Sequence, residues 1–92
     1  QPVQIHITDE VLDDLRARLR QTRWPDQIPG IGWEQGTDRD WLRHLVSYWA
    51  DTFDWRTWER KLNKLQHFTW EGIHFVHRRA ASGRGMPLIL TH

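Results

Sequence analysis

The feature that most constrains the fold is a short apolar run near the carboxyl end of the chain, residues 87–91. Residues 88–90 are all aliphatic, and the polar residues Thr91 and His92 follow at once. A continuous apolar run that ends in polar residues is typical of a central strand buried on both faces, with chemistry at its carboxyl end. Such a strand needs neighbouring strands, which 92 residues barely provide. We therefore expect an α/β fold of which this chain is the front part.

Aromatic content points the same way. The chain holds seven Trp, three Phe and one Tyr. Each ring could bury about 150–250 Å², but a chain of this size removes only roughly 60% of its unfolded surface from water. We expect many rings to stay exposed unless a partner or a further domain covers them. The alternative is a dense small core in a self-sufficient module.

Charge and cysteine usage exclude several classes of protein. Thirteen basic and twelve acidic side chains leave a formal charge of +1, which gives no electrostatic footprint for nucleic acid or an anionic membrane. The absence of cysteine excludes disulfides, thiolate metal ligands and a cysteine nucleophile. No stretch approaches the roughly 20 apolar residues of a membrane span, and residues 1–8 lack the features of a signal peptide. We expect a cytoplasmic protein without nucleic-acid or membrane partners.

Periodicity predicts helices separated by an irregular segment. An alternating arm over residues 3–7 precedes a helix over residues 9–21, for which Thr8 is the expected N-cap. Residues 23–36 hold two prolines and three glycines, so no regular element can persist there. Trp24 and Trp33 lie in this segment, and such rings usually pin a loop to a neighbouring surface.

A second helix should follow Thr37 or Asp38, either of which can cap it, and Asp54 can start a third helix or a kinked continuation. The second helix carries a wide apolar stripe at steps of three and four: Trp41, Leu42, Leu45, Tyr48, Trp49 and Phe53. The third has an apolar face (Trp55, Trp58, Leu62, Leu65) and a solvated face (Arg56, Glu59, Arg60, Lys61, Lys64). Regular spacing with a charged opposite face favours core packing over a binding site.

The last elements are strands. β-forming residues flank Glu71 and Gly72 over residues 67–77, which predicts a tight hairpin. Residues 1–65 then form a meander with two or three helices, and residues 66–92 form the first strands of a sheet that is incomplete. A metal site at His74 and His77 is disfavoured, because residues three apart on a strand point to opposite faces and no carboxylate lies at ligand spacing.

Several segments together resemble a known family. They are TRWPD at residues 22–26, GW at 32–33, YWADTFDWRTWERKLN at 48–63, Phe68 with EGIHFVH at 71–77, and PLILTH at 87–92. In order and spacing they resemble the N-terminal region of the epoxide hydrolases related to the microsomal enzyme. The resemblance spans essentially the whole chain and is specific, because several tryptophan-containing segments must coincide.

The resemblance implies a fold for this chain and a structural role for its residues. It implies a meandering segment wrapped over an α/β-hydrolase domain, with a β-hairpin and a following buried strand as the first strands of the sheet, and an end before the catalytic core. In the family that strand leads into a His-Gly-Trp-Pro turn whose backbone helps form the oxyanion hole, and His92 matches its first position. No catalytic or metal-binding residue is expected in this chain. The expected structural anchors are Trp24, Pro25, Trp33, Trp49, Trp55 and Trp58.

The activity that the resemblance implies needs residues beyond His92. An aspartate opens the epoxide to an ester while two lid tyrosines bind the alkoxide, and a histidine with an acidic partner activates the water that releases a vicinal diol. No cofactor is required. The expected partners are the rest of the hydrolase domain, a small-molecule epoxide and, as a further option, a second copy in a homodimer. The alternatives are an α/β-hydrolase with another activity and a stand-alone aromatic-rich module that binds a protein.

Overall fold

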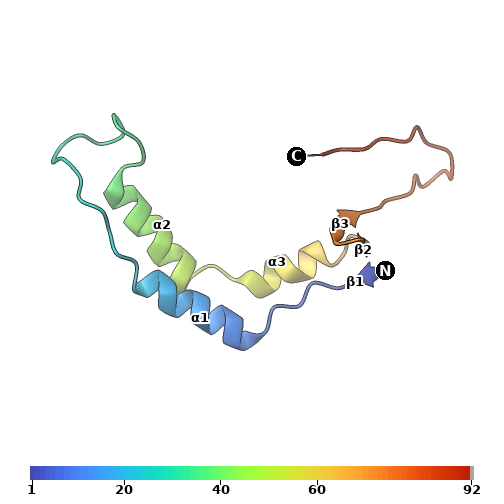
Figure 1. Cartoon of the computed structure of the whole chain (residues 1–92), viewed down its shortest axis with the longest axis horizontal. Coiled ribbons are helices and arrows are strands. Elements are labelled where there is room, and N and C mark those ends of the chain that lie inside the picture. The colour runs from blue at the N-terminus through green and yellow to red at the C-terminus, as the bar shows by residue number, and fades with distance from the viewer. Residues whose placement is uncertain (92) are drawn as a thin grey trace. The chain divides into compact units, whose positions relative to one another are not determined.

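The computed structural model describes residues 1–91, which form two compact units (Figure 1). The helical unit is His6–Trp55. The sheet unit combines Gln1–Ile5 with the chain from Arg56 onward. Each unit is described by itself below.

The helical unit is built on two helices, α1 (Asp9–Arg20) and α2 (Arg39–Asp51). The hydroxyl of Thr8 accepts a bond of 3.5 Å from the backbone N–H of Val11, so Thr8 caps α1 as predicted. Of the two candidates for the second cap, it is Asp38 that serves, and its carboxylate accepts from the N–H of Trp41 at 3.0 Å. These bonds satisfy backbone donors that a helix leaves without partners at its start.

The connection between α1 and α2 contains only turns, as its prolines and glycines predicted. The side-chain amide of Gln27 holds it together. Its Nε2 donates to the carbonyl of Gly32 and to the carboxylate of Asp38, both at 3.1 Å. Its Oε1 accepts from the N–H of Arg39 at 2.7 Å. The loop is thereby tied to the first turn of α2.

The sheet unit contains α3 (Trp55–Leu62, whose first residue groups with the helical unit) and the strands β1 (Pro2–Val3), β2 (His67–Trp70) and β3 (Ile73–Val76). The strands form one antiparallel sheet in the order β1-β2-β3. Of the predicted arm, residues 3–7, Val3 pairs with His67 of β2, a partner that the sequence did not reveal, and residues 4–7 lie outside the strand. The predicted hairpin is confirmed, with Phe68 opposite Phe75.

The hairpin turn has the geometry that two-residue connections favour. Glu71 and Gly72 have φ angles of 46° and 80°. Two consecutive positive φ values are the mark of a type I′ turn, whose twist matches that of the flanking strands. Gly adopts this conformation without strain, whereas Glu does so at a cost.

Residues 87–91 differ from the sequence prediction. They form no strand, and Leu88, Ile89 and Leu90 are 77%, 86% and 84% exposed. The prediction of a buried strand is therefore wrong for the 92-residue chain. A central strand exists only through hydrogen bonds to strands on both sides, and none of the described residues pairs with this segment. His92, the residue matched to the oxyanion turn, lies outside the described residues.

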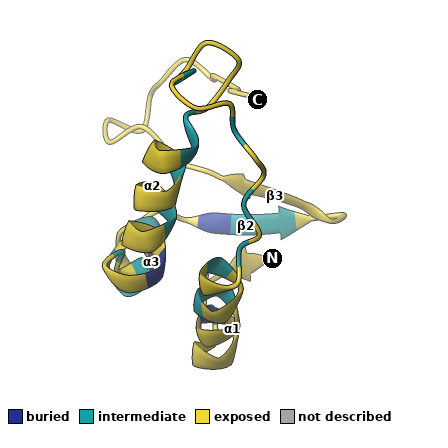
Figure 2. Ribbon diagram, turned by 90° about the vertical axis from the view of Figure 1, so that its left-hand side faces the viewer, coloured by how far each residue is buried: buried dark blue, intermediate teal, exposed yellow. Residues whose placement is uncertain are grey.

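Burial is sparse in both units, as Figure 2 shows. Among the described residues, the buried apolar residues are Leu12 and Ala50, which are 7% and 5% exposed. The stripe on α2 was expected to be core, but Trp41, Leu45, Tyr48 and Trp49 remain between 43% and 52% exposed. The helices α1 and α2 pack on each other, but these four side chains of the stripe stay in contact with solvent.

The faces of α3 were assigned wrongly in part. Glu59 was placed on the solvated face, yet it is 6% exposed and its carboxylate lies 2.8 Å from the guanidinium of Arg56. Trp58 was placed on the apolar face, yet it is exposed. A carboxylate can be buried at low cost when a cation and hydrogen bonds accompany it, and spacing alone does not reveal such a partner.

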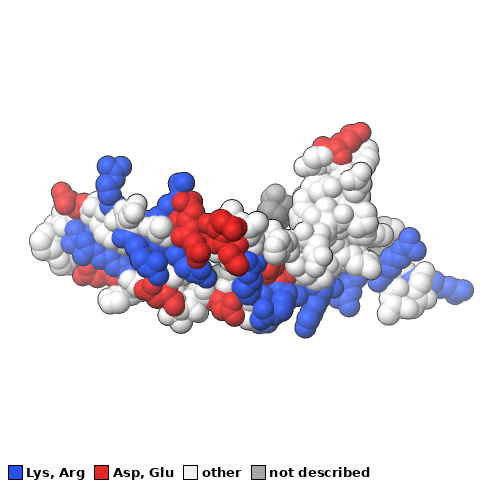
Figure 3. Space-filling model, turned by 90° about the horizontal axis from the view of Figure 1, so that it is seen from below, with Lys and Arg blue, Asp and Glu red and all other residues white. Residues whose placement is uncertain are grey.

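The net charge of +1 is the sum of a basic sheet unit and an acidic helical unit. The sheet unit carries seven Lys and Arg against two Asp and Glu, and the helical unit six against ten. In Figure 3 acidic and basic side chains are interspersed over the part of the chain that carries α1 and α2. Interspersed charges of this kind suit a solvated surface rather than a site for a polyanion.

Candidate functional site

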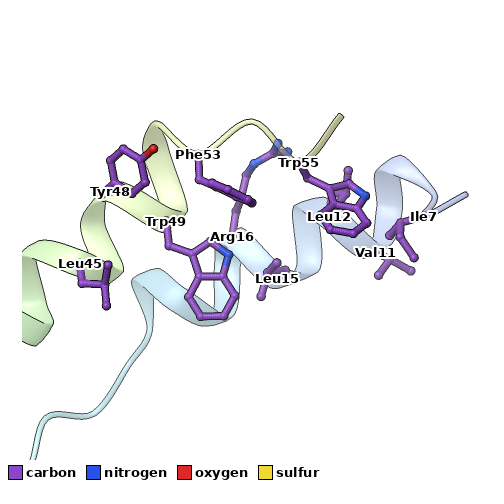
Figure 4. Close-up of a pocket in the computed structure, with 10 residues that line it drawn as sticks. All are labelled: Ile7, Val11, Leu12, Leu15, Arg16, Leu45, Tyr48, Trp49, Phe53 and Trp55. Atoms are coloured by element: carbon purple, nitrogen blue, oxygen red, sulfur yellow. The ribbon is translucent and has the colours of Figure 1, made fainter. Parts of the chain in front are cut away.

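An apolar groove runs along α1 and α2 in the helical unit and is here called the α1–α2 groove (Figure 4). Its volume is about 610 Å³. Its lining residues are Ile7, Val11, Leu12, Leu15, Arg16, Leu45, Tyr48, Trp49, Phe53 and Trp55.

Helical periodicity explains how these residues come together. On α1, Val11 and Leu15 are four apart and so lie on one face, and on α2 the same spacing joins Leu45 and Trp49. The segment after α2 adds Phe53, whose ring lies 6.5 Å from that of Tyr48. The groove is therefore the uncovered remainder of two amphipathic faces that meet along one edge.

The groove can bind apolar surface, but it contains no acid–base machinery. Its one charged lining residue is Arg16, whose guanidinium pairs with the carboxylate of Asp13 at 2.9 Å. No carboxylate or imidazole lines it. General acid–base or nucleophilic hydrolysis needs such groups within hydrogen-bond reach of the reacting atom, and the groove lining offers apolar contact instead.

The predicted anchors Trp24 and Pro25 lie where the meander meets α2. The guanidinium of Arg43 lies 5.6 Å from the ring centroid of Trp24, within the range of a cation–π contact. The carbonyl of Pro25 accepts from Nη1 of Arg39 at 3.3 Å. Both anchors thus attach the loop to cationic residues of α2.

The other four anchors fall in two groups. Trp49 and Trp55 line the α1–α2 groove. Trp33 and Trp58 are exposed: Trp33 meets Trp41 edge-on at 5.2 Å, and the ammonium of Lys61 lies 4.3 Å from the ring of Trp58. The structure therefore brings two of the six predicted anchors together in one site.

Sequence reasoning missed a histidine pair in the sheet unit. Nδ1 of His67 lies 3.0 Å from Nε2 of His74, and Nε2 of His67 lies 2.7 Å from the carbonyl of Leu62. The carbonyl can only accept, so Nε2 of His67 donates to it, and the donor in the His67–His74 contact is set by the tautomers of the two rings. The hairpin register, which places both residues on one face, is the signal that could have found the pair.

Residues 1–91 contain no group of three or more His, Asp or Glu side chains placed to hold a metal ion. Within the same range, no helix is long and apolar enough to cross a bilayer.

The pKa of Glu10 is lowered by hydrogen bonds to its carboxylate, which favour the charged form. The larger effect comes from its own backbone N–H and the smaller from the side chain of Thr8.

Comparisons with known proteins agree on one family. The family model described as epoxide hydrolase N terminus matches residues 1–92. A putative epoxide hydrolase of Stigmatella aurantiaca is 37% identical over 99% of this chain, and epoxide hydrolase 1 of Sus scrofa is 34% identical over the same share. The match covers 22% of each of these relatives, so the chain spans about a fifth of their length.

A solved structure gives the same result for the fold. The epoxide hydrolase of Aspergillus niger superposes on 90% of this chain with a TM-score of 0.73 and 28% identity, and the match covers 23% of that protein. The helices and the small antiparallel sheet are thus those of the N-terminal part of an α/β-hydrolase fold. On this evidence the chain belongs to the family of epoxide hydrolase N-terminal regions.

Proposed function

We propose that the complete protein is an epoxide hydrolase and that this chain forms its N-terminal region. The observation that carries the proposal is the match of the epoxide hydrolase N-terminal model to all 92 residues, supported by relatives of that name. Because the chain spans about a fifth of those relatives, the residues that perform the reaction belong to the remaining part of the protein.

The proposed reaction has two steps. An aspartate carboxylate attacks one epoxide carbon, the C–O bond breaks, and the alkoxide takes a proton from a lid tyrosine. A water then gives one proton to histidine and attacks the carbonyl carbon of the ester, and the C–O bond to the substrate breaks. The histidine gives that proton to the leaving oxygen of the vicinal diol, the second proton of the water returns to the tyrosine, and the carboxylate is restored. The oxyanion formed in this second step is stabilised by backbone N–H groups, and the turn that starts at His92 would supply part of that site.

The role of this chain in the complete protein is structural. The meander and the helices would brace the hydrolase core and lid, and residues 87–91 would become a paired strand once neighbouring strands are present. The proposed partners are the rest of the hydrolase domain and a small-molecule epoxide, with a homodimer as a further option. The proposed compartment is the cytoplasm, and no cofactor enters the reaction.

Isotope labelling during a single turnover tests the proposed chemistry. The complete protein, in molar excess over a reporter epoxide, is incubated in water enriched in oxygen-18. The oxygen added to the substrate comes from the aspartate, so the diol should be unlabelled and the label should appear in one protein carboxylate. A labelled diol would contradict the ester intermediate, and the absence of any diol would contradict the activity itself.

A further inference from the structure

We propose that the contact between His67 and His74 makes the β2–β3 hairpin sensitive to pH. The contact holds while at least one of the two rings is neutral and breaks when both carry a proton. The inference does not depend on the proposed activity. It begins from the observation that His67 is 5% exposed and that both of its ring nitrogens have partners.

The register of the sheet fixes where the two rings lie. His67 lies opposite Val3 of β1 and Val76 of β3, and His74 lies opposite Thr69. The two histidines are therefore diagonal neighbours on one face of the sheet. Their rings are nearly parallel, at 11°, with centroids 5.1 Å apart. His74 itself is exposed, so protons from water can reach the pair.

The contact accommodates one added proton but not two. Nε2 of His67 donates to the carbonyl of Leu62 at 2.7 Å, so this nitrogen keeps its proton. The contact of 3.0 Å between Nδ1 of His67 and Nε2 of His74 needs one N–H and one lone pair. A donor can face an acceptor when both rings are neutral or when one is protonated. When both are protonated, two N–H groups and two positive charges face each other and repel.

The charges on the neighbouring elements are mainly positive. The two acidic residues of the sheet unit are Glu59, whose carboxylate lies 2.8 Å from the guanidinium of Arg56, and Glu71, which is exposed in the turn. His77 follows β3 and lies on the opposite face from His74. The cationic groups on the surrounding segments are the N-terminal ammonium of Gln1, Arg60, Lys61, Lys64, Arg78 and Arg79. These charges disfavour a second imidazolium at the pair.

The number of bound protons therefore links the hairpin to pH. When the hairpin opens, both imidazoles are free to bind protons, whereas the closed pair holds one. The open state binds more protons in acid, so the closed hairpin loses stability as the pH falls through the ordinary range of histidine, about 6.5, and keeps it above that range. Weak acid opens the hairpin more often, and a return to neutral pH restores it.

Hydrogen exchange of the hairpin in the complete protein tests the proposal at about pH 7.5 and about pH 5, on either side of the histidine range. Mass spectrometry follows the peptide that contains residues 67–76, and the rates are corrected for the pH dependence of exchange in unfolded peptides. His74→Gln places a donor and an acceptor in one neutral amide, so it can pair with His67 whether or not that ring is protonated. The matched control His77→Gln removes one imidazole from the opposite face of the same hairpin.

Protection of the hairpin should fall by about fivefold or more in acid, the worth of one hydrogen bond, both in the unaltered protein and in His77→Gln. In His74→Gln it should change by less than about twofold. Protection that does not change with pH in the unaltered protein would overturn the proposal, and so would an equal loss in His74→Gln. If His74→Gln does not fold, His67→Gln removes the other ring and should likewise give protection that does not depend on pH.

Discussion

Asn63, the residue that follows α3, fixes the arm before α1 through both atoms of its side-chain amide. Its Oδ1 accepts from the N–H of Ile5 at 2.9 Å, and its Nδ2 donates to the carbonyl of Ile5 at 2.7 Å. A net hydrogen bond is worth about 0.5–1.5 kcal/mol, so Asn63→Ala should destabilise the arm by roughly 1–3 kcal/mol. Hydrogen exchange of the Ile5 amide measures this loss.

The variant Asn63→Asp is the control for that prediction, because it keeps the acceptor for the Ile5 N–H and loses the donor. Exchange of the Ile5 amide should be slower in Asn63→Asp than in Asn63→Ala. Identical exchange in the two variants and the unaltered chain would show that the amide of Asn63 does not hold the arm.

Glu10 makes the start of α1 sensitive to acid. Its pKa is lowered in the folded chain by hydrogen bonds to its carboxylate, so the unfolded chain binds the proton more readily and stability rises with pH through the acid range. The contribution is complete above the ordinary pKa of Glu, about 4.3, and is lost as the pH falls through the lowered value. We expect Glu10→Gln to weaken α1 at neutral pH.

The measurement is the helix signal and the amide exchange of α1 as the pH is lowered from neutral into the acid range. The difference between Glu10→Gln and the unaltered chain should disappear at low pH, where both side chains are neutral. A difference that stays constant with pH would mean that charge at Glu10 plays no part.

At the scale of elements, the β2–β3 turn gives two changes of opposite sign. Gly72 has a φ of 80°, and a Cβ there would meet no atom within 4 Å. Gly72→Ala should therefore cost only the backbone strain of a left-handed residue, about 1–2 kcal/mol. Asn tolerates positive φ better than Glu, so Glu71→Asn should stabilise the hairpin by roughly 0.5 kcal/mol. Hydrogen exchange of the Phe68 and Phe75 amides measures the change in hairpin stability for both variants. If both variants change the stability in the same direction, the assigned turn is contradicted.

Elements defined by local chemistry could be predicted from the sequence. The cap at Thr8, the irregular meander and the Glu71–Gly72 turn depend on residues a few positions apart, and all three are present. The partner of β1 could not be predicted, because it depends on a contact between segments far apart in the sequence. The burial of Glu59 could not be predicted, because it depends on the ion pair with Arg56. The strand at residues 87–91 failed because a strand needs neighbours that the described residues do not supply.

The sequence predicts that aromatic surface is exposed, but it does not predict which residues come together in the groove. An excess of rings over interior predicted exposed aromatic surface, and Trp33, Trp41, Tyr48 and Trp49 are exposed. The joining of α1 and α2 residues into one groove required the packing of the two helices. Likewise, the His67–His74 contact required the register of the hairpin.

At the scale of the whole molecule, the proposed function explains three features together: the small buried core, the open groove and the unpaired segment at residues 87–91. Under that proposal, the rest of the hydrolase domain covers the apolar side chains that are exposed here. The match to a fifth of longer epoxide hydrolases supports that explanation. Under the proposed function, the chain contributes to an activity that it does not possess alone.

Paired activity measurements test this most directly. The complete protein and the 92-residue chain, each purified free of host hydrolases, are incubated with the same reporter epoxide, and diol formation is followed by chromatography. We expect diol formation by the complete protein and none by the 92-residue chain, because the proposed nucleophile, base and lid tyrosines belong to the rest of the protein. Turnover by the 92-residue chain, or a complete protein that leaves a broad panel of epoxides unchanged, would contradict it.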